Sequence, residues 1–245
     1  MSHAASLAAV ALLTIASDPP SFPAQAPVLE LDHVYIVVEP GAAAAVQALR
    51  QAGLVVDSSV RRHPGEGTAS VAAFFDNAYL ELLWVDSSVT VDSLHRQDWV
   101  AFTRAETWRR SGASPFGLGL HFLSGTAADL QVPMRLDSAY VLLRQPAESL
   151  AADLFVMPAR SAVPAWVDRF KSRRPDLFAH PLGVRRVTRA TVRGPPPHRP
   201  HAAALAPRLI SFEDATTPQL VLEFDEGRQH RTIDLRPVLP LVLLY

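Results

Sequence analysis

Four strand-like segments of this sequence each contain an imidazole or carboxylate within the strand, of the kind that binds metals or moves protons. They are LDHVYIVV with His33, AYLELLWV with Glu81, GLGLHFL with His121 and QLVLEFD with Glu223. Because successive strand residues point to opposite faces, Glu81 lies on the side away from Leu80, Leu82 and Trp84. An ionised carboxylate buried without a partner is costly, so Glu81 needs a metal, a cation or a hydrogen-bond donor beside it.

Two imidazoles and two carboxylates suit a divalent cation such as Zn, Ni, Fe, Mn or Co, with open positions for substrate oxygens. Such a metal could polarise a carbonyl or enediolate oxygen while Glu81 or Glu223 acts as ligand or base. Strand parity places Tyr35 on the face of His33, together with Leu31 and Val37, and we expect Tyr35 to contact the substrate.

The elements that must position these side chains follow one another in the order βαβββ. A β-branched and aromatic run, an Ala-rich run with helical spacing that Gly53 ends, and three further strand-like runs give that order. The five segments are 28–38, 41–54, 55–62, 68–76 and 78–85. The Asp76-Asn77 pair predicts a hairpin turn between the last two.

The rest of the chain predicts further strands around shorter helices. Residues 91–110 are charged and aromatic and predict a helix or a helix pair, and 163–178 predict a short helix that Pro175 ends. Further strands are expected at 115–123, in AYVLLRQ, in DLFVMPA, and at 184–193, 208–214 and 218–225. AYLELLWV and QLVLEFD both place a Glu after apolar residues, which suggests a degraded second copy of the first module.

Composition restricts the class of protein. The chain has 245 residues, 49% of them hydrophobic, with a formal net charge of −1 and no cysteine. A chain of this length can form a hydrophobic core. Because the net charge is not positive, it does not favour nucleic acid or an anionic membrane as a partner. The absence of cysteine excludes disulfides and thiolate chemistry. A small-molecule ligand is therefore the expected partner.

The N-terminal 27 residues predict either a signal peptide or a disordered arm with a Pro-rich linker. The apolar run Ala4 to Ala16 has the length of a signal-peptide core, and an A-x-A pattern follows at Ala24 to Ala26. No Lys or Arg precedes the run, and Pro27 would follow the cleavage site directly. Export to the periplasm and a cytoplasmic location both stay open.

LDHVYIVV, the Ala-rich helix and HPGEGTASVAAFFDNAYLELLWV resemble the vicinal oxygen chelate superfamily, which includes glyoxalases, bleomycin-resistance proteins and dioxygenases, and in particular its glyoxalase-like domain proteins. The resemblance is good over 28–86, weaker over 115–158 and partial over 180–225. It implies an α+β fold in which paired βαβββ modules form a half-open curved sheet around a divalent metal. The metal ligands that it implies are His33 and Glu81 from the first module and Glu223 from the second. It also implies dimerisation.

The chain departs from the family pattern at the second module's first strand. Arg186 or Thr188 occupies the position where the family carries His or Gln, and neither is an ordinary metal ligand. An arginine there would neutralise Glu81 or Glu223, or bind an anionic substrate. His121 is the candidate replacement ligand. The partner of Glu81 is thus either a metal or an arginine. The loop from His63 to Gly67 reads either as a ligand-binding loop or as a simple turn.

The expected organisation has four parts. Residues 1–27 form the arm or signal, 28–112 the first module with a helical extension, 113–179 intervening strands and a short helix, and 180–245 a degenerate second module. Three functions stay open. The protein is a metal-dependent lyase, isomerase or dioxygenase-like enzyme, a binding protein that sequesters a small molecule, or an exported scaffold whose site is filled by side chains and whose Glu81 is paired internally.

Overall fold

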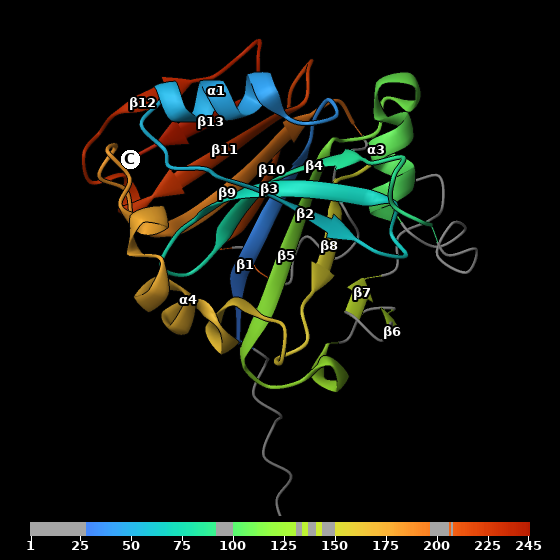
Figure 1. Ribbon diagram of the computed structural model, residues 1–245. Helices are drawn as coiled ribbons and strands as arrows, with labels where there is room; N and C mark the ends of the chain where they lie inside the picture. The colour runs from blue at the N-terminus through green and yellow to red at the C-terminus, as the bar shows by residue number, and fades with distance from the viewer. Residues whose placement is uncertain are drawn as a thin grey trace, which may run out of the picture.

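The computed structural model describes residues 28–91, 100–130, 134–136, 141–143, 150–196, 206 and 208–245. The N-terminal arm and residues 92–99 of the predicted helical extension lie outside these ranges. The described residues form two β-sheets with helices around them (Figure 1). They include no helix that is long and apolar enough to cross a membrane.

The first module has the predicted βαβββ order. It consists of β1 (Val28–Val37), α1 (Ala43–Gln51), β2 (Asp57–His63), β3 (Thr68–Phe74) and β4 (Tyr79–Val85). Helix α1 buries Ala45 and Leu49 and ends before Gly53, whose φ of 85° is in the left-handed region that glycine adopts without strain. The helix α3 (Val100–Ser111) follows the module.

The next four strands continue the same sheet in mirrored order. They are β5 (Phe116–Ser124), β6 (Met134–Leu136), β7 (Val141–Leu143) and β8 (Asp153–Val156). The strand order of this eight-stranded sheet is β2-β3-β4-β1-β5-β8-β7-β6, with β1 parallel to β4, β5 parallel to β8, and β1 antiparallel to β5. The second half therefore repeats the pairing of the first, but a single turn of 3-10 helix (Ala127–Asp129) takes the place of α1. The predicted α+β fold of paired modules with a degenerate second module is confirmed.

The C-terminal strands form a separate five-stranded sheet. These strands are β9 (Val187–Gly194), β10 (Ile210–Asp214), β11 (Gln219–Phe224), β12 (Thr232–Asp234) and β13 (Leu241–Leu244). Their order is β10-β9-β11-β13-β12. The sequence placed the second module at 180–245, whereas the strands that mirror the first module come from 116–156. Helix α4 (Val167–Arg173) and short 3-10 turns at Val163–Ala165 and Pro175–Phe178 link the two sheets.

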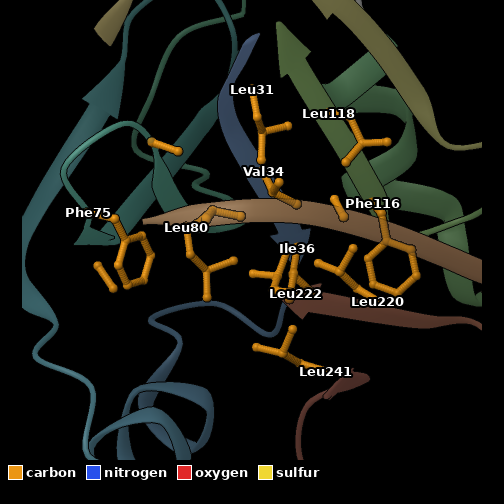
Figure 2. Packing of buried hydrophobic residues seen from close by; sticks show 14 of the residues in the cluster. Leu31, Val34, Ile36, Phe75, Leu80, Phe116, Leu118, Leu220, Leu222 and Leu241 are labelled. Atoms are coloured by element: carbon orange, nitrogen blue, oxygen red, sulfur yellow. The ribbon is translucent and has the colours of Figure 1, made fainter. Parts of the chain in front are cut away.

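One hydrophobic core joins the sheets. Side chains from β1, β4 and β5 pack against side chains from β11 and β13 (Figure 2). The labelled residues of this core are Leu31, Val34, Ile36, Phe75, Leu80, Phe116, Leu118, Leu220, Leu222 and Leu241. The eight-stranded sheet thus turns one face to the second sheet, and its opposite face carries the polar residues.

Candidate functional site

The polar face of the eight-stranded sheet is opposite the core that the two sheets share. On β1 and β4, the alternate residues Val34 and Leu82 belong to the shared core, while Tyr35 and Leu83 belong to a separate cluster with Phe155 of β8. Parity therefore places the odd-numbered residues of β1 and β4, from His33 and Tyr79 onward, on this second face. This confirms the predicted side for Glu81.

A β-bulge at Asp32 makes the central pair of the site. The register between β1 and β5 shifts between Leu31 and His33, so that Asp32 is an extra residue on β1. A bulge lets neighbouring residues share a face, and Asp32 Oδ1 lies 2.8 Å from His33 Nδ1. The parity that placed Leu31 beside His33 was wrong for this reason: Leu31 lies on the other side of the bulge and packs in the shared core.

The His33 ring is fixed on several sides. It stacks on Tyr79 with centroids 4.5 Å apart and an interplanar angle of 11°, and it contacts Phe155 at 5.1 Å. It also lies over Gly119, where a Cβ atom would be 2.8 Å from Cε1 of the imidazole. Asp32 is a carboxylate at neutral pH, so His33 Nδ1 donates to it, and a neutral His33 carries its lone pair on Nε2.

Asp32 keeps its charge although it is buried. Burial raises the pKa of this carboxyl group, but hydrogen bonding to His121 and His33 and the backbone N–H of Val163 outweigh that effect and lower the pKa to about 2. The Val163 N–H donates to Asp32 Oδ2 at 2.7 Å. Asp32 is therefore a fixed anion that orients His33.

Tyr35 crosses β5 to reach β8. Its ring covers Gly117, and its hydroxyl donates to Asp153 Oδ2 at 3.0 Å. Burial raises the pKa of Asp153 and raises that of Tyr35 well above its usual value, and the Asp153 charge raises the Tyr35 pKa further. The predicted substrate contact Tyr35 is therefore tied to Asp153, a residue that the sequence analysis did not single out.

Glu81 forms an ion pair with a histidine. Its Oε1 lies 3.7 Å from Nε2 of His63, whose Nδ1 lies 3.3 Å from Glu66. Burial lowers the pKa of His63, but the hydrogen bond to Glu66 and the charges of Glu81 and Glu66 outweigh it, so the net shift is upward. The sequence pattern did not single out His63, because this residue is the last of β2. It also begins a loop that was considered only as a turn or as a source of backbone N–H groups.

Arg186 and Glu223 lie away from this pair. The guanidinium of Arg186 donates to Glu30 Oε1 at 3.1 Å, so among the described residues its partner is Glu30 and not Glu81 or Glu223. Glu223 is on β11 of the other sheet, where Thr188 Oγ1 donates to its backbone carbonyl at 3.1 Å. His121 lies at the other end of the polar face, between Glu30 and Asp32.

A groove of about 520 Å³ lies elsewhere on the first module. It is lined by residues of α1 and β2 together with Val71, which belongs to the shared core. The groove therefore lies on the α1 side of the sheet and contains none of the predicted site residues. The cluster around His33 and Glu81 is the stronger candidate for chemistry.

A family model and a solved structure are similar to parts of this chain. Residues 31–121, which begin just before His33 and end at His121, match the model of the family described as glyoxalase-like domain. Over these residues the chain is similar to a glyoxalase-like domain. No curated protein matches it. A solved structure, described as a hypothetical protein from Staphylococcus aureus, is similar at 8% sequence identity with a TM-score of 0.49, and the match covers 88% of this chain and 98% of that one.

The two halves of the eight-stranded sheet differ at the positions that carry His33 and Glu81 in the first half. In the first half of the sheet, β1–β4 pairing begins at His33 with Tyr79, and Tyr35 pairs with Glu81. In the second half, β5–β8 pairing begins at Gly117 with Asp153, and Gly119 pairs with Phe155. When the first residue pair of β1–β4 is aligned with the first residue pair of β5–β8, Gly117 corresponds to His33, and Phe155 corresponds to Glu81.

This difference between the halves determines how many side chains could bind a metal ion. His33, with Nδ1 on a carboxylate, and Glu81 are both plausible donors, but Gly117 and Phe155 supply none. Among the described residues, no three His, Asp or Glu side chains form a group that could hold a metal ion, so the predicted set of His33, Glu81, His121 and Glu223 is not assembled. The described residues therefore do not fit the three or four protein ligands of an ordinary divalent metal centre.

Proposed function

We propose that the polar face around His33 and Glu81 binds a small oxygenated compound and transfers a proton on it, as in an isomerase or lyase. The observation that supports this most is the bulge at Asp32, which places a carboxylate on Nδ1 of His33 and directs the base function to Nε2. A carboxylate that fixes the tautomer and orientation of an imidazole is the arrangement that general-base histidines use.

In this proposal His33 removes a proton from a carbon next to a carbonyl group. Among the described residues Nε2 has no hydrogen-bond partner, so its lone pair is available to a substrate. The raised pKa of His63 favours its imidazolium form, whose positive charge would favour negative charge developing on a substrate oxygen nearby. Glu81 would hold His63 in place through their ion pair.

The proposal is tested by hydrogen exchange in deuterated water. The purified chain is incubated with a panel of small 2-hydroxycarbonyl and 2-oxo compounds, and loss of the C–H signal is followed by proton NMR. We expect exchange with at least one compound and a loss of about 100-fold or more in His33→Gln. The control is His230→Asn, because His230 is exposed and has a φ of 53°, which asparagine tolerates.

A second candidate is a binding or scaffold protein whose site is filled by its own side chains. Tyr35 and His33 occupy the room over Gly117 and Gly119, and Glu81 is paired internally with His63. Ligand-induced shifts in the NMR spectrum without any C–H exchange would favour binding without chemistry. Neither shifts nor exchange with any compound would favour the filled site.

A further inference from the structure

Arg61 of β2 lies on the same face of the eight-stranded sheet as Glu81. It pairs with Ser70 in the β2–β3 register, and Ser70 pairs with Leu83, which belongs to the cluster around Tyr35. Residues directly opposite each other in antiparallel strands have their side chains on one face. The guanidinium of Arg61 is therefore a cation on the polar face, and an arginine keeps its charge at any physiological pH.

Two aromatic rings hold this guanidinium. Its Cζ lies over the ring of Phe74 at 4.8 Å from the centroid, and at 5.9 Å from the centroid of Phe170 on α4. A cation–π contact fixes the position of an arginine but supplies no acceptor oxygen. Phe74 also contacts Tyr79, which stacks on His33, so a continuous row of rings joins Arg61 to the proposed base.

The N–H donors of Arg61 have no hydrogen-bond acceptor among the described residues. In this part of the chain its ion-pair partner is Asp57, whose Oδ2 lies 3.8 Å from Nη2, which is too long for a hydrogen bond. The other oxygen of Asp57 accepts the backbone N–H of Ser59 at 3.0 Å. The side chain of Arg61 is 43% exposed, so a ligand in solution can reach its donors.

The other charges near Arg61 on this face are paired with one another. His63 lies between Glu66 and Glu81, at 3.3 Å and 3.7 Å from their carboxylate oxygens. Arg61 is placed differently, because it is held by rings and not by a hydrogen-bonded carboxylate. A carboxylate or phosphate bound there would receive two parallel N–H bonds from the planar guanidinium.

We propose that Arg61 binds an anionic group of the substrate, a carboxylate or a phosphate, at the end remote from the carbon that reacts at His33. β3 and β4 separate β2 from β1, and neighbouring strands are about 4.8 Å apart, so the two ends of the substrate are on the order of 10 Å apart. The substrate class is an extended anionic hydroxycarbonyl or oxo compound. The inference rests on the proposed function for the reacting end, whereas binding of the anionic end is measurable without any reaction.

The experiment compares compounds that differ in one anionic group. Ribose 5-phosphate against ribose tests a phosphate, and 2-oxoglutarate against 2-oxopentanoate tests a remote carboxylate. NMR titration of the full chain at constant ionic strength measures each dissociation constant. In at least one pair, we expect the wild-type protein to bind the compound with the added anionic group about 10-fold more tightly. Arg61→Gln should reduce this preference to about twofold or less, and Arg61→Lys, which keeps the charge but not the planar fork, should retain only part of it.

The matched control is Arg62→Gln, which removes the same charge from the neighbouring residue. Arg62 pairs with Ala69 of the shared core, so its side chain points to the opposite face, and its Nε lies 3.2 Å from Asp86. Arg62→Gln should leave the preference unchanged. If it reduced the preference as much as Arg61→Gln, net charge alone would matter and the proposal would be overturned.

Two results with the wild-type protein would also overturn the proposal: equal binding of both members in each pair, or no binding of ribose 5-phosphate or 2-oxoglutarate. Failure of C–H exchange with the preference intact would count against the proposed function alone.

Discussion

The ring of Tyr35 lies directly on Gly117, so closely that a Cβ atom at Gly117 would be 2.0 Å from Cε1 of that ring. The glycine lets Tyr35 cross β5 and donate to Asp153. We therefore expect Gly117→Ala to displace the ring, break this hydrogen bond and reduce the free energy of unfolding by about 1–3 kcal/mol. Urea unfolding monitored by fluorescence measures the change.

A double-mutant cycle tests whether the Tyr35 ring causes the cost of Gly117→Ala. In a Tyr35→Ala background the ring is gone, so the added methyl group of Gly117→Ala has room. We expect the cost of Gly117→Ala to fall below about 0.5 kcal/mol there. Equal costs in both backgrounds would show that the strand itself, rather than the Tyr35 ring, needs glycine at this position.

The raised pKa of His121 predicts how stability depends on pH. An unfolded histidine titrates near 6.5, whereas His121 in the folded protein titrates near 9. Between these values the folded protein binds more protons, so its free energy of unfolding should decrease as pH rises from 6.5 through 9. The contribution of this group is on the order of 3 kcal/mol.

Urea unfolding at pH 6, 7, 8, 9 and 10 measures this dependence, and the difference between wild type and His121→Gln isolates the contribution of the histidine. The two curves should converge as pH rises. Parallel curves over this range would contradict a protonated His121 in the folded protein.

The local pattern of the sequence predicted the first module well, because it depends on residues close to one another in the chain. Alternation and helix spacing identified β1 to β4 and α1, and they placed Glu81 on the correct face. The mirrored half was harder to recognise, because β6, β7 and β8 have only three, three and four residues and a 3-10 turn replaces the helix.

The site was only partly predictable, because its geometry depends on one extra residue and on pairing between distant segments. The bulge at Asp32 cannot be read from LDHVYIVV, since it exists only relative to β5. Asp153 and His121 become informative only once β5 is known to lie beside β1, and β8 beside β5. Arg186 was recognised as a departure from the family pattern, but its partner Glu30 is 156 residues away.

The ion pair between Glu81 and His63 predicts a change in titration. In Glu81→Gln the carboxylate that helps to raise the His63 pKa is lost, so we expect this pKa to fall. Glu66→Gln should lower it as well, because Glu66 provides the largest of the contributions that raise it. The titration is measured from the His63 ring signals in NMR spectra between pH 4 and 9.

The effect on stability should be small, since the His63 side chain is 23% exposed, and we expect less than about 1 kcal/mol. Its sign is fixed: a raised pKa stabilises the folded state at low pH, so the loss in Glu81→Gln should be larger at pH 5 than at pH 9. An unchanged His63 pKa in Glu81→Gln would show that the two groups do not interact in solution.

The asymmetry between the two halves of the sheet predicts how the protein treats metals. In the second half of the sheet, Gly117 and Phe155 occupy the positions that correspond to His33 and Glu81, so the described residues provide two donors where a stable centre needs three or four. We expect chain purified without an affinity tag or chelator to contain well under one equivalent of Zn, Ni, Fe, Mn or Co. Inductively coupled plasma mass spectrometry measures this, before and after incubation with each metal. The comparison is Glu81→Gln, which removes one donor and should leave the metal content unchanged. One equivalent of metal in the wild type that disappears in Glu81→Gln would contradict the expectation and identify the partner of Glu81 as a metal.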